Sequence, residues 1–188
     1  MVYKNIFFSL SLIIIISFLS WTSFVLFRPQ DTKPLNVDNR PDALMENVTA
    51  LILDKQGKPK LKVITPKLVH FPSGDTTRFT SPQLTLYRHS PKPWFITSQY
   101  AKASQGIENI DFWDHVIIHH AADENNPATI IKTSMLTVFP NKNLAQTTQH
   151  ITMTQPSLVV KAIGMHANLK TGDIKLLSQA RGEYVPSS

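Results

Sequence analysis

Residues 6–27 form one apolar segment of 22 residues without a charged residue, a glycine or a proline. As an α-helix the segment would be about 33 Å long, close to the thickness of a bilayer hydrocarbon core. It is longer than the apolar core of a cleaved signal peptide, and no Ala-x-Ala site follows it, although Ser20 and Ser23 leave a cleaved signal as the alternative. The sequence therefore predicts a retained, single N-terminal transmembrane helix.

The charges around this segment do not decide its orientation, because Lys4 on one side faces Arg28 and Lys33 on the other. The short tail before the segment favours a cytoplasmic N-terminus. We therefore expect a cytoplasmic tail at residues 1–5, a membrane anchor at 6–27, a proline-rich linker at 28–41 and a domain outside the cytoplasm at 42–188.

The composition limits what this domain can be. Cysteine is absent, which excludes disulfides and Cys-based zinc sites. After residue 27 the chain has 18 basic and 13 acidic residues, and no two basic residues are adjacent. This spread is typical of a solvated surface, with a mild preference for anionic partners such as phosphorylated lipids as the functional alternative. Without a basic stripe, nucleic-acid binding is not expected.

From residue 42 onward, short runs rich in Val, Ile, Thr and aromatic residues alternate with turn signals, such as those at 54–57 and 140–143. Proline interrupts nearly every window that could form an amphipathic helix, so the pattern predicts an all-β domain. The pair Thr-Ser recurs at 80–81, 97–98 and 133–134, each time where a strand is expected to open. Unless this is coincidence in a Thr-rich chain, it predicts a ladder of antiparallel strands in units of about 17 residues.

A ladder has two edge strands with unpaired backbone groups. The last run, Asp173–Tyr184, contains no proline and is predicted to be an open edge that can pair with another chain. Just before it, the alternation of apolar and polar residues places Ile163, Met165, Ala167 and Leu169 on one face.

Five phenylalanines lie in the predicted strands or at their ends: Phe71, Phe79, Phe95, Phe112 and Phe139. They fit two arrangements. One is the packed core of a β-sandwich, and the other is a pair of curved sheets that do not close and leave an apolar trough for acyl chains. The sequence leaves both open.

Catalytic and metal-binding motifs are not found. His115 and His119, on one strand face, would lie about 13 Å apart, too far to share one ion. The chain has no Gly-x-Ser-x-Gly, no phosphate-binding Gly-rich loop and no His-Glu-x-x-His. Asp111 and Asp114 are expected on opposite faces of a strand rather than as an acid–base pair. We therefore expect no enzymatic activity, no metal and no cofactor.

Six segments carry a resemblance to a known family. They are residues 41–48 (PDALMENV), 54–57 (DKQG), 79–82 (FTSP), 93–96 (PWFI), 113–116 (WDHV) and 176–184 (LLSQARGEY). With the apolar segment before them, their order and the length of the chain resemble the LptC family of the lipopolysaccharide export system.

The resemblance implies an extended, twisted β-jellyroll, open along one side, in the periplasm, with the anchor in the inner membrane. It implies that the domain accepts lipopolysaccharide from an inner-membrane ATP-binding-cassette transporter complex and shields the acyl chains in an open groove. The lipid would pass to a soluble periplasmic jellyroll protein similar to LptA through an edge-to-edge contact of the C-terminal strand.

Phe79, in the matching segment, is the strongest candidate for lining such a groove. Further lipid-binding candidates are Phe71, Phe95, Phe112, Leu84, Val48, Ile174 and Tyr184. The competing interpretation is a membrane-tethered scaffold or glycan-binding module with a closed β-sandwich and no lipid groove. A cell-envelope hydrolase is a third possibility, which the missing catalytic residues disfavour.

Overall fold

The computed structural model describes residues 40–87, 92–124 and 126–184. The predicted transmembrane helix at 6–27 and most of the predicted linker lie outside these ranges. All described residues belong to one compact unit, Asn39–Ser188. In the ranges described, no helix is long and apolar enough to cross a membrane.

Every regular element of the described part is a β-strand, which confirms the prediction of an all-β domain. The strands are β1 (Ala43–Leu53), β2 (Pro59–Phe71), β3 (Thr76–Thr80), β4 (Gln83–Leu86), β5 (Trp94–Thr97), β6 (Tyr100–Ser104), β7 (Asn109–His120), β8 (Thr129–Phe139), β9 (Leu144–Gln155), β10 (Leu158–Asn168) and β11 (Ile174–Tyr184).

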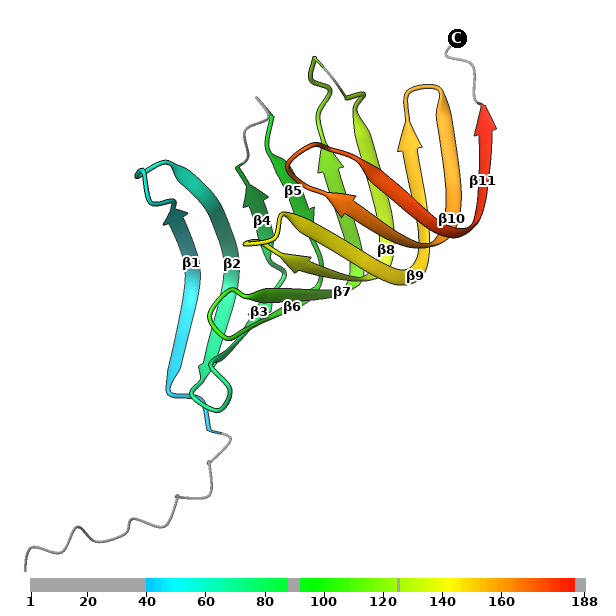
Figure 1. The fold of residues 1–188 in the computed structure, drawn as a ribbon. Helices are drawn as coiled ribbons and strands as arrows, with labels where there is room; N and C mark the ends of the chain where they lie inside the picture. Colours follow the sequence, from blue (N-terminus) through cyan, green and yellow to red (C-terminus); the bar gives the residue numbers. More distant parts are fainter. Residues whose placement is uncertain (1–39, 88–91, 125, 185–188) are drawn as a thin grey trace, which may run out of the picture. The chain divides into compact units, whose positions relative to one another are not determined.

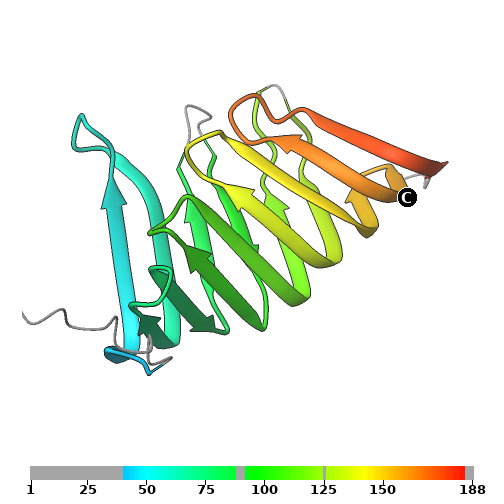
Figure 2. The same ribbon diagram turned by 60° about the horizontal axis from the view of Figure 1, so that its bottom comes forward.

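These strands form one antiparallel sheet whose order largely follows the chain, from β1 at one end to β11 at the other (Figures 1 and 2). β2 pairs with β1 on one side and with both β3 and β4 on the other. Among the described strands, β1 pairs only with β2 and β11 only with β10. Both are therefore edges, and the prediction of an open C-terminal edge strand is confirmed.

The sheet folds along a line, called the crease below, that separates two half-sheets. In the β3–β6 half-sheet, residues 67–71 of β2 and 109–113 of β7 pair with β3 and β6. In the β4–β5 half-sheet, residues 61–64 of β2 and 117–120 of β7 pair with β4 and β5. The long strands therefore cross the crease and contribute to both halves.

Residues with a positive φ mark the crease. They are Asn47 (φ 51°) in β1, Ser81 (φ 46°) after β3, Asp114 (φ 64°) and His115 (φ 55°) in β7, Gly164 (φ 76°) in β10 and Gln179 (φ 50°) in β11. The strand registers of β7, β8 and β10 also shift there, which is the signature of β-bulges. Because a bulge bends and twists a strand, a row of bulges folds the whole sheet.

The recurring Thr-Ser pairs lie at this crease and do not open strands as expected. Thr80 ends β3, Thr97 ends β5 and Thr133 lies within β8. The hydroxyl of Ser98 donates to the carbonyl of Tyr100 at 2.7 Å, and that of Thr133 lies 3.0 Å from the carbonyl oxygen of His150. Short hydroxyl side chains satisfy carbonyl groups that the bend takes out of the ladder.

The inner faces of the two half-sheets pack against each other over β7 to β10. Phe112, Ile131, Leu136 and Met165 are at most 1% exposed there. The prediction that Ile163 shares the inner face with Met165 is wrong, because the bulge at Gly164 shifts the register between them. Ala162, next to Ile163, is buried instead. A bulge changes the face of every residue beyond it, and simple alternation cannot anticipate it.

Candidate functional site

An apolar cavity of about 170 Å³, called the trough below, lies between the half-sheets at the β1 end of the sheet. Its walls come from β1, β2, β3, β4, β6 and β7. The lining residues are Val48, Ala50, Ile52, Leu61, Val63, Leu68, Thr77, Phe79, Pro82, Leu84, Ala101, Ala103, Gly106, Ile107, Ile110 and Phe112. Thr77 is the one member of this set with a polar side chain, so the trough suits a hydrocarbon ligand.

The trough exists because β6 presents small side chains to the interior. Phe79 pairs with Ala101, and Ala101 pairs with Phe112 on the next strand. Ala101 and Ala103 are 1% and 2% exposed, so their methyl groups form a floor between larger neighbours. Lys102 lies between them in sequence and therefore on the outer face of β6. The segment Tyr100–Ser104 therefore forms a strand with small side chains on its inner face and polar side chains on its outer face.

Apolar residues at alternating positions of β1 and β2 form the opposite wall of the trough. Val48 and Ile52 are half-buried and face the trough, while the intervening Leu51 is exposed. Leu61 and Val63 of β2 are buried. β1 is an edge strand and has only β2 to hold it within the described sheet. The wall on this side of the trough is therefore supported by a neighbouring strand on one side only.

Four of the eight predicted lipid-binding residues meet in the trough: Val48, Phe79, Leu84 and Phe112. Leu84 and Phe112 are 2% and 1% exposed and form its base. Phe79 and Val48 are half-buried. The remaining four residues are not part of the trough lining, and their contact with lipid stays a prediction.

Phe71 lies under the guanidinium group of Arg78, at 4.8 Å from the ring centroid. It lines a surface cleft with Tyr100 and Trp113, and this cleft shares Phe79 and Ala101 with the trough. Phe71 is three residues from the trough-lining Leu68, and an odd spacing puts it on the other face of β2. Phe95 is 40% exposed and stacks on His119, with ring centroids 6.1 Å apart. Its neighbours in β5, Trp94 and Ile96, are the buried residues.

Tyr184 and Ile174 bound the edge strand β11, away from the trough. Tyr184, at the end of β11, is 72% exposed. Ile174 packs against the core and borders a different cavity, of about 260 Å³, together with Trp94 and His120. Sequence reasoning missed most of the aliphatic lining, including Ile52, Leu61, Ile107 and Ile110. Two features of the sequence could have predicted this lining. They are the alternating apolar residues of β1 and β2 and the two alanines of β6.

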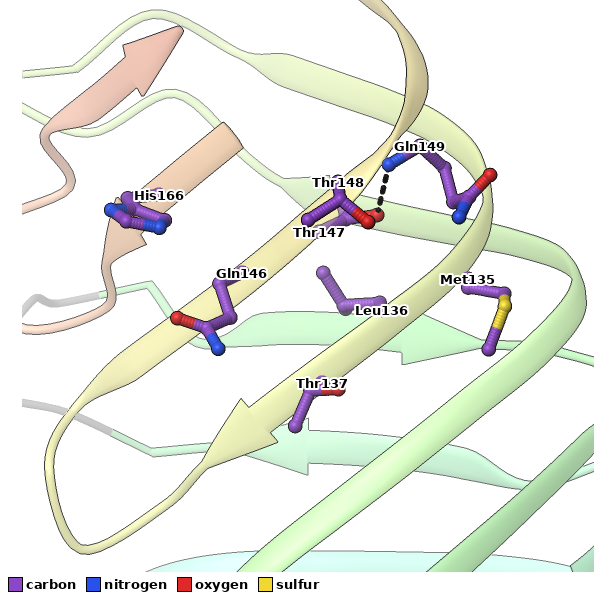
Figure 3. A pocket seen from close by; sticks show the side chains of 8 residues that line it. All are labelled: Met135, Leu136, Thr137, Gln146, Thr147, Thr148, Gln149 and His166. Atoms are coloured by element: carbon purple, nitrogen blue, oxygen red, sulfur yellow. Dashed lines mark hydrogen bonds between the residues drawn. The ribbon is translucent and has the colours of Figure 1, made fainter. Parts of the chain in front are cut away.

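A second cleft, of about 180 Å³, has a different chemical character (Figure 3). Its lining residues are Met135, Leu136, Thr137, Gln146, Thr147, Thr148, Gln149 and His166. The backbone N–H of Gln149 donates to the Thr147 hydroxyl at 3.1 Å, as the dashed line in Figure 3 shows. Amides and hydroxyls line much of this cleft, so it does not extend the apolar trough.

Histidine does not build a metal centre in the described residues, where no group of three or more His, Asp or Glu side chains is placed to hold an ion. His120 instead lies 3.5 Å from a carboxylate oxygen of Asp123, and both side chains are 2% exposed. Its ring packs against Trp94 with centroids 4.5 Å apart. His115, at the crease, lies 2.6 Å from the carboxylate of Asp114.

His70 joins two carboxylates at the β1 end. Its Nδ1 lies 2.6 Å from Asp42 Oδ1 and its Nε2 lies 3.1 Å from Asp75 Oδ1. These two hydrogen bonds raise the pKa of His70, and the bond to His70 lowers the pKa of Asp42. An imidazole can donate to both carboxylates only when it is protonated. The pair of bonds ties the residue before β1 to the turn between β2 and β3.

The folded antiparallel sheet defines an all-β protein of the jellyroll class. The family described as "Lipopolysaccharide-assembly, LptC-related" matches residues 10–185. The chain belongs to this family, which confirms the resemblance found in the sequence and connects the protein to lipopolysaccharide transport.

A solved structure supports the fold independently. The crystal structure of LptH from Pseudomonas aeruginosa is described as that of the LptA homologous periplasmic component of the conserved lipopolysaccharide transport device. It superimposes with a TM-score of 0.52 at 8% sequence identity, over 68% of this chain and 95% of that chain. At this identity the similarity shows a shared jellyroll fold. No curated protein sequence matches the chain.

Proposed function

We propose that the domain carries lipopolysaccharide by holding its acyl chains in the trough, and that it does so as a carrier without enzymatic activity. The observation that supports the proposal is the trough itself, in which Thr77 alone among the lining residues has a polar side chain. Burying apolar surface stabilises by about 25 cal/mol per Å², so an acyl chain gains several kcal/mol on entering.

The trough must widen when it takes up lipid. Its volume of about 170 Å³ is below the roughly 300–1,000 Å³ of typical small-molecule sites. β1 is an edge strand that pairs with β2 alone among the described strands, so we expect it to be the element that moves. A resting trough that is partly collapsed suits a relay, because the lipid has to leave again.

We further propose how the carrier is placed. Residues 6–27 anchor it in the inner membrane, and the domain lies in the periplasm, where it accepts lipid from an ATP-binding-cassette transporter complex. The free edge of β11 offers unpaired backbone groups to a soluble jellyroll partner similar to LptA. The family membership and the fold shared with a periplasmic transport component support this placement.

Site-specific photo-crosslinking in living cells tests the proposal. A photo-reactive residue at Phe79 is expected to give an adduct with lipopolysaccharide that depends on ATP hydrolysis by the transporter. Phe95 is the matched control, because the same side chain there is 40% exposed on the outer face. Adducts of equal strength at both positions, or none at Phe79, would overturn the proposal and favour the scaffold interpretation.

A further inference from the structure

The trough is not the largest cavity of the domain. A cavity of about 580 Å³, called the cationic pocket below, lies where four connecting regions meet on the side away from the crease. These regions are the β1–β2 turn, the end of β4, the β8–β9 turn and the β10–β11 loop. The lining residues are Asp54, Lys58, Pro59, Lys60, Tyr87, Pro140, Asn141, Asn143 and Lys170.

Positive charge dominates this pocket. Lys58, Lys60 and Lys170 contribute three ammonium groups, against one carboxylate from Asp54. Oδ1 of that carboxylate already accepts the backbone N–H groups of Gln56 and Lys58, both at 2.9 Å. Within the described part of the chain, none of the three lysines forms an ion pair. Lys60 donates at 2.7 Å to the neutral Asn141 Oδ1.

Backbone hydrogen bonds fix the loops that carry these lysines. In the β1–β2 turn, the N–H of Asp54 donates to Lys58 at 2.8 Å and that of Gly57 donates to Asp54 at 3.0 Å. Next to Lys170, the N–H of Leu169 donates to the carbonyl of Asn143 at 2.8 Å. Three ammonium groups and a single carboxylate leave the pocket with a net positive charge, which attracts an anion, and lysine binds phosphate as a point charge.

The cationic pocket and the trough are lined by neighbouring residues of β1 and β2, although they share no lining residue. Lys60 precedes Leu61, which is fully buried and lines the trough, while Lys60 lines the pocket. On β1, Ile52 lines the trough and Asp54, two residues further on, lines the pocket. One pair of strands therefore presents an apolar wall and, at its end, a cationic rim, in the order of the acyl chains and headgroup of an anionic lipid.

We propose that the cationic pocket binds a phosphate group of the lipid whose acyl chains occupy the trough. The inference rests on the proposed lipid-carrying function and specifies which part of the lipid is recognised outside the trough. Lys58 and Lys170, both exposed, neutralise the phosphate, and the Tyr87 hydroxyl and the Asn143 amide offer further hydrogen-bond donors. Lys60 has a second role, because its bond to Asn141 joins β2 to the β8–β9 turn.

Binding of two lipids to the full-length protein in detergent micelles tests this. The ligands are lipopolysaccharide and the same preparation after enzymatic removal of its phosphates. The test variant is Lys58→Gln with Lys170→Gln. The control variant is Lys132→Gln with Lys161→Gln, which removes two exposed lysines of the strand surface that lie outside the pocket. Inorganic phosphate serves as a competitor.

The test variant is expected to bind phosphorylated lipid about tenfold more weakly than the wild type and the control variant, and dephosphorylated lipid equally well. Equal binding of both lipids by both variants would overturn the phosphate site while leaving the trough intact. Wild-type protein that binds neither lipid would overturn the proposed function as well. If millimolar inorganic phosphate lowers the affinity for phosphorylated lipid to the affinity measured for dephosphorylated lipid, the phosphate site is supported. If inorganic phosphate binds but leaves the affinity for phosphorylated lipid unchanged, the pocket is a site for free phosphate, and the proposal is overturned.

Discussion

His70 shows how one side chain can hold the start of an edge strand. Hydrogen bonds to Asp42 and Asp75 use both ring nitrogens, so the protonated form is the one that fits. Its pKa is raised above the ordinary value of 6.5, while the pKa of Asp42 is lowered below 3.8. The contribution of His70 to stability is complete below pH 6.5 and is lost as pH rises through the raised pKa of His70. The contribution of Asp42 is present above pH 3.8 and is lost as pH falls through the lowered pKa of Asp42.

We expect His70→Gln to lower the melting temperature in a pH-dependent way. The difference from the wild type should be greatest between about pH 4 and pH 6.5, where both partners carry their charge, and should shrink as pH rises above that range. Because these groups are solvated, the effect should be small and should weaken in high salt. Thermal denaturation of both proteins from pH 4 to pH 9 measures it. A difference that does not change with pH would contradict the protonated geometry.

Comparing Gly164 with Gly57 separates the effect of backbone conformation on stability from the effect of side-chain packing. Its φ is +76°, and an added Cβ would lie 2.8 Å from Leu177 Cδ1. Gly57 has nearly the same φ, +77°, with nothing within 4 Å of the corresponding position. Gly57→Ala should therefore cost about 1 kcal/mol of backbone strain. Gly164→Ala should cost a further 1–3 kcal/mol or so from overpacking. Urea denaturation of the two variants measures the difference, and equal losses would contradict the packing argument.

At the scale of strands, the crease is the element that makes the jellyroll. Thr133 is 9% exposed, and its hydroxyl lies 3.0 Å from the carbonyl oxygen of His150 and 3.3 Å from that of Met135. Thr65 makes the same kind of contact on β2, 2.6 Å from the carbonyl oxygen of Thr80. These hydroxyls stabilise a bend that would otherwise leave part-buried carbonyl groups without a donor.

Thr133→Val keeps the side-chain shape and removes the donor. We expect it to lower the free energy of unfolding by about 1 kcal/mol, because a part-buried carbonyl group loses its donor. Thr154→Val, at an exposed position of β9, is the control and should change stability by less than about 0.5 kcal/mol. Chemical denaturation of the two variants measures both changes in the free energy of unfolding. No loss of stability in Thr133→Val would mean that water or a backbone N–H replaces the hydroxyl as the donor.

The sequence predicts the strands better than their faces. The all-β class, the antiparallel ladder and the free last strand follow from residue types and turn signals, and all three are confirmed. The face of each phenylalanine does not follow, because Trp94, Phe95 and Ile96 are apolar on both sides of the strand. The bulge at Gly164 is also hidden, since glycine alone does not reveal a change of register. The two alternatives for the interior turn out to coexist, as a packed core over β7 to β10 and a trough at the β1 end.

At the scale of the whole molecule, the proposed carrier function requires that the lipid leaves towards the far edge. The trough lies at the β1 end, whereas the edge proposed to meet the next carrier is β11. Between them the half-sheets are closed by side chains such as Ile131 and Met165, both 0% exposed. Passage of acyl chains along the domain therefore requires the half-sheets to separate over β7 to β10 while the crease stays intact.

Loss of the apolar character of the trough should abolish transport without unfolding the domain. Phe79→Asp places a carboxylate at a half-buried position that a hydrocarbon chain would have to contact, which disfavours lipid entry. A strain that carries only this variant should fail to grow, while Phe95→Asp, on the outer face, should support normal growth. Circular dichroism of the purified proteins controls for folding. Normal growth with Phe79→Asp would contradict the role of the trough.

The order of the strands also has a consequence for how the domain is made. Most pairs join strands that are neighbours in the chain, and the exceptions, such as β2 with β4 and β3 with β6, skip one or two. The segments to be closed are short, so the entropy lost in forming each contact is modest, and folding can spread from one hairpin to the next. A chain that emerges from its N-terminus onward can therefore fold as it is delivered, with β11 as the last strand to join the ladder.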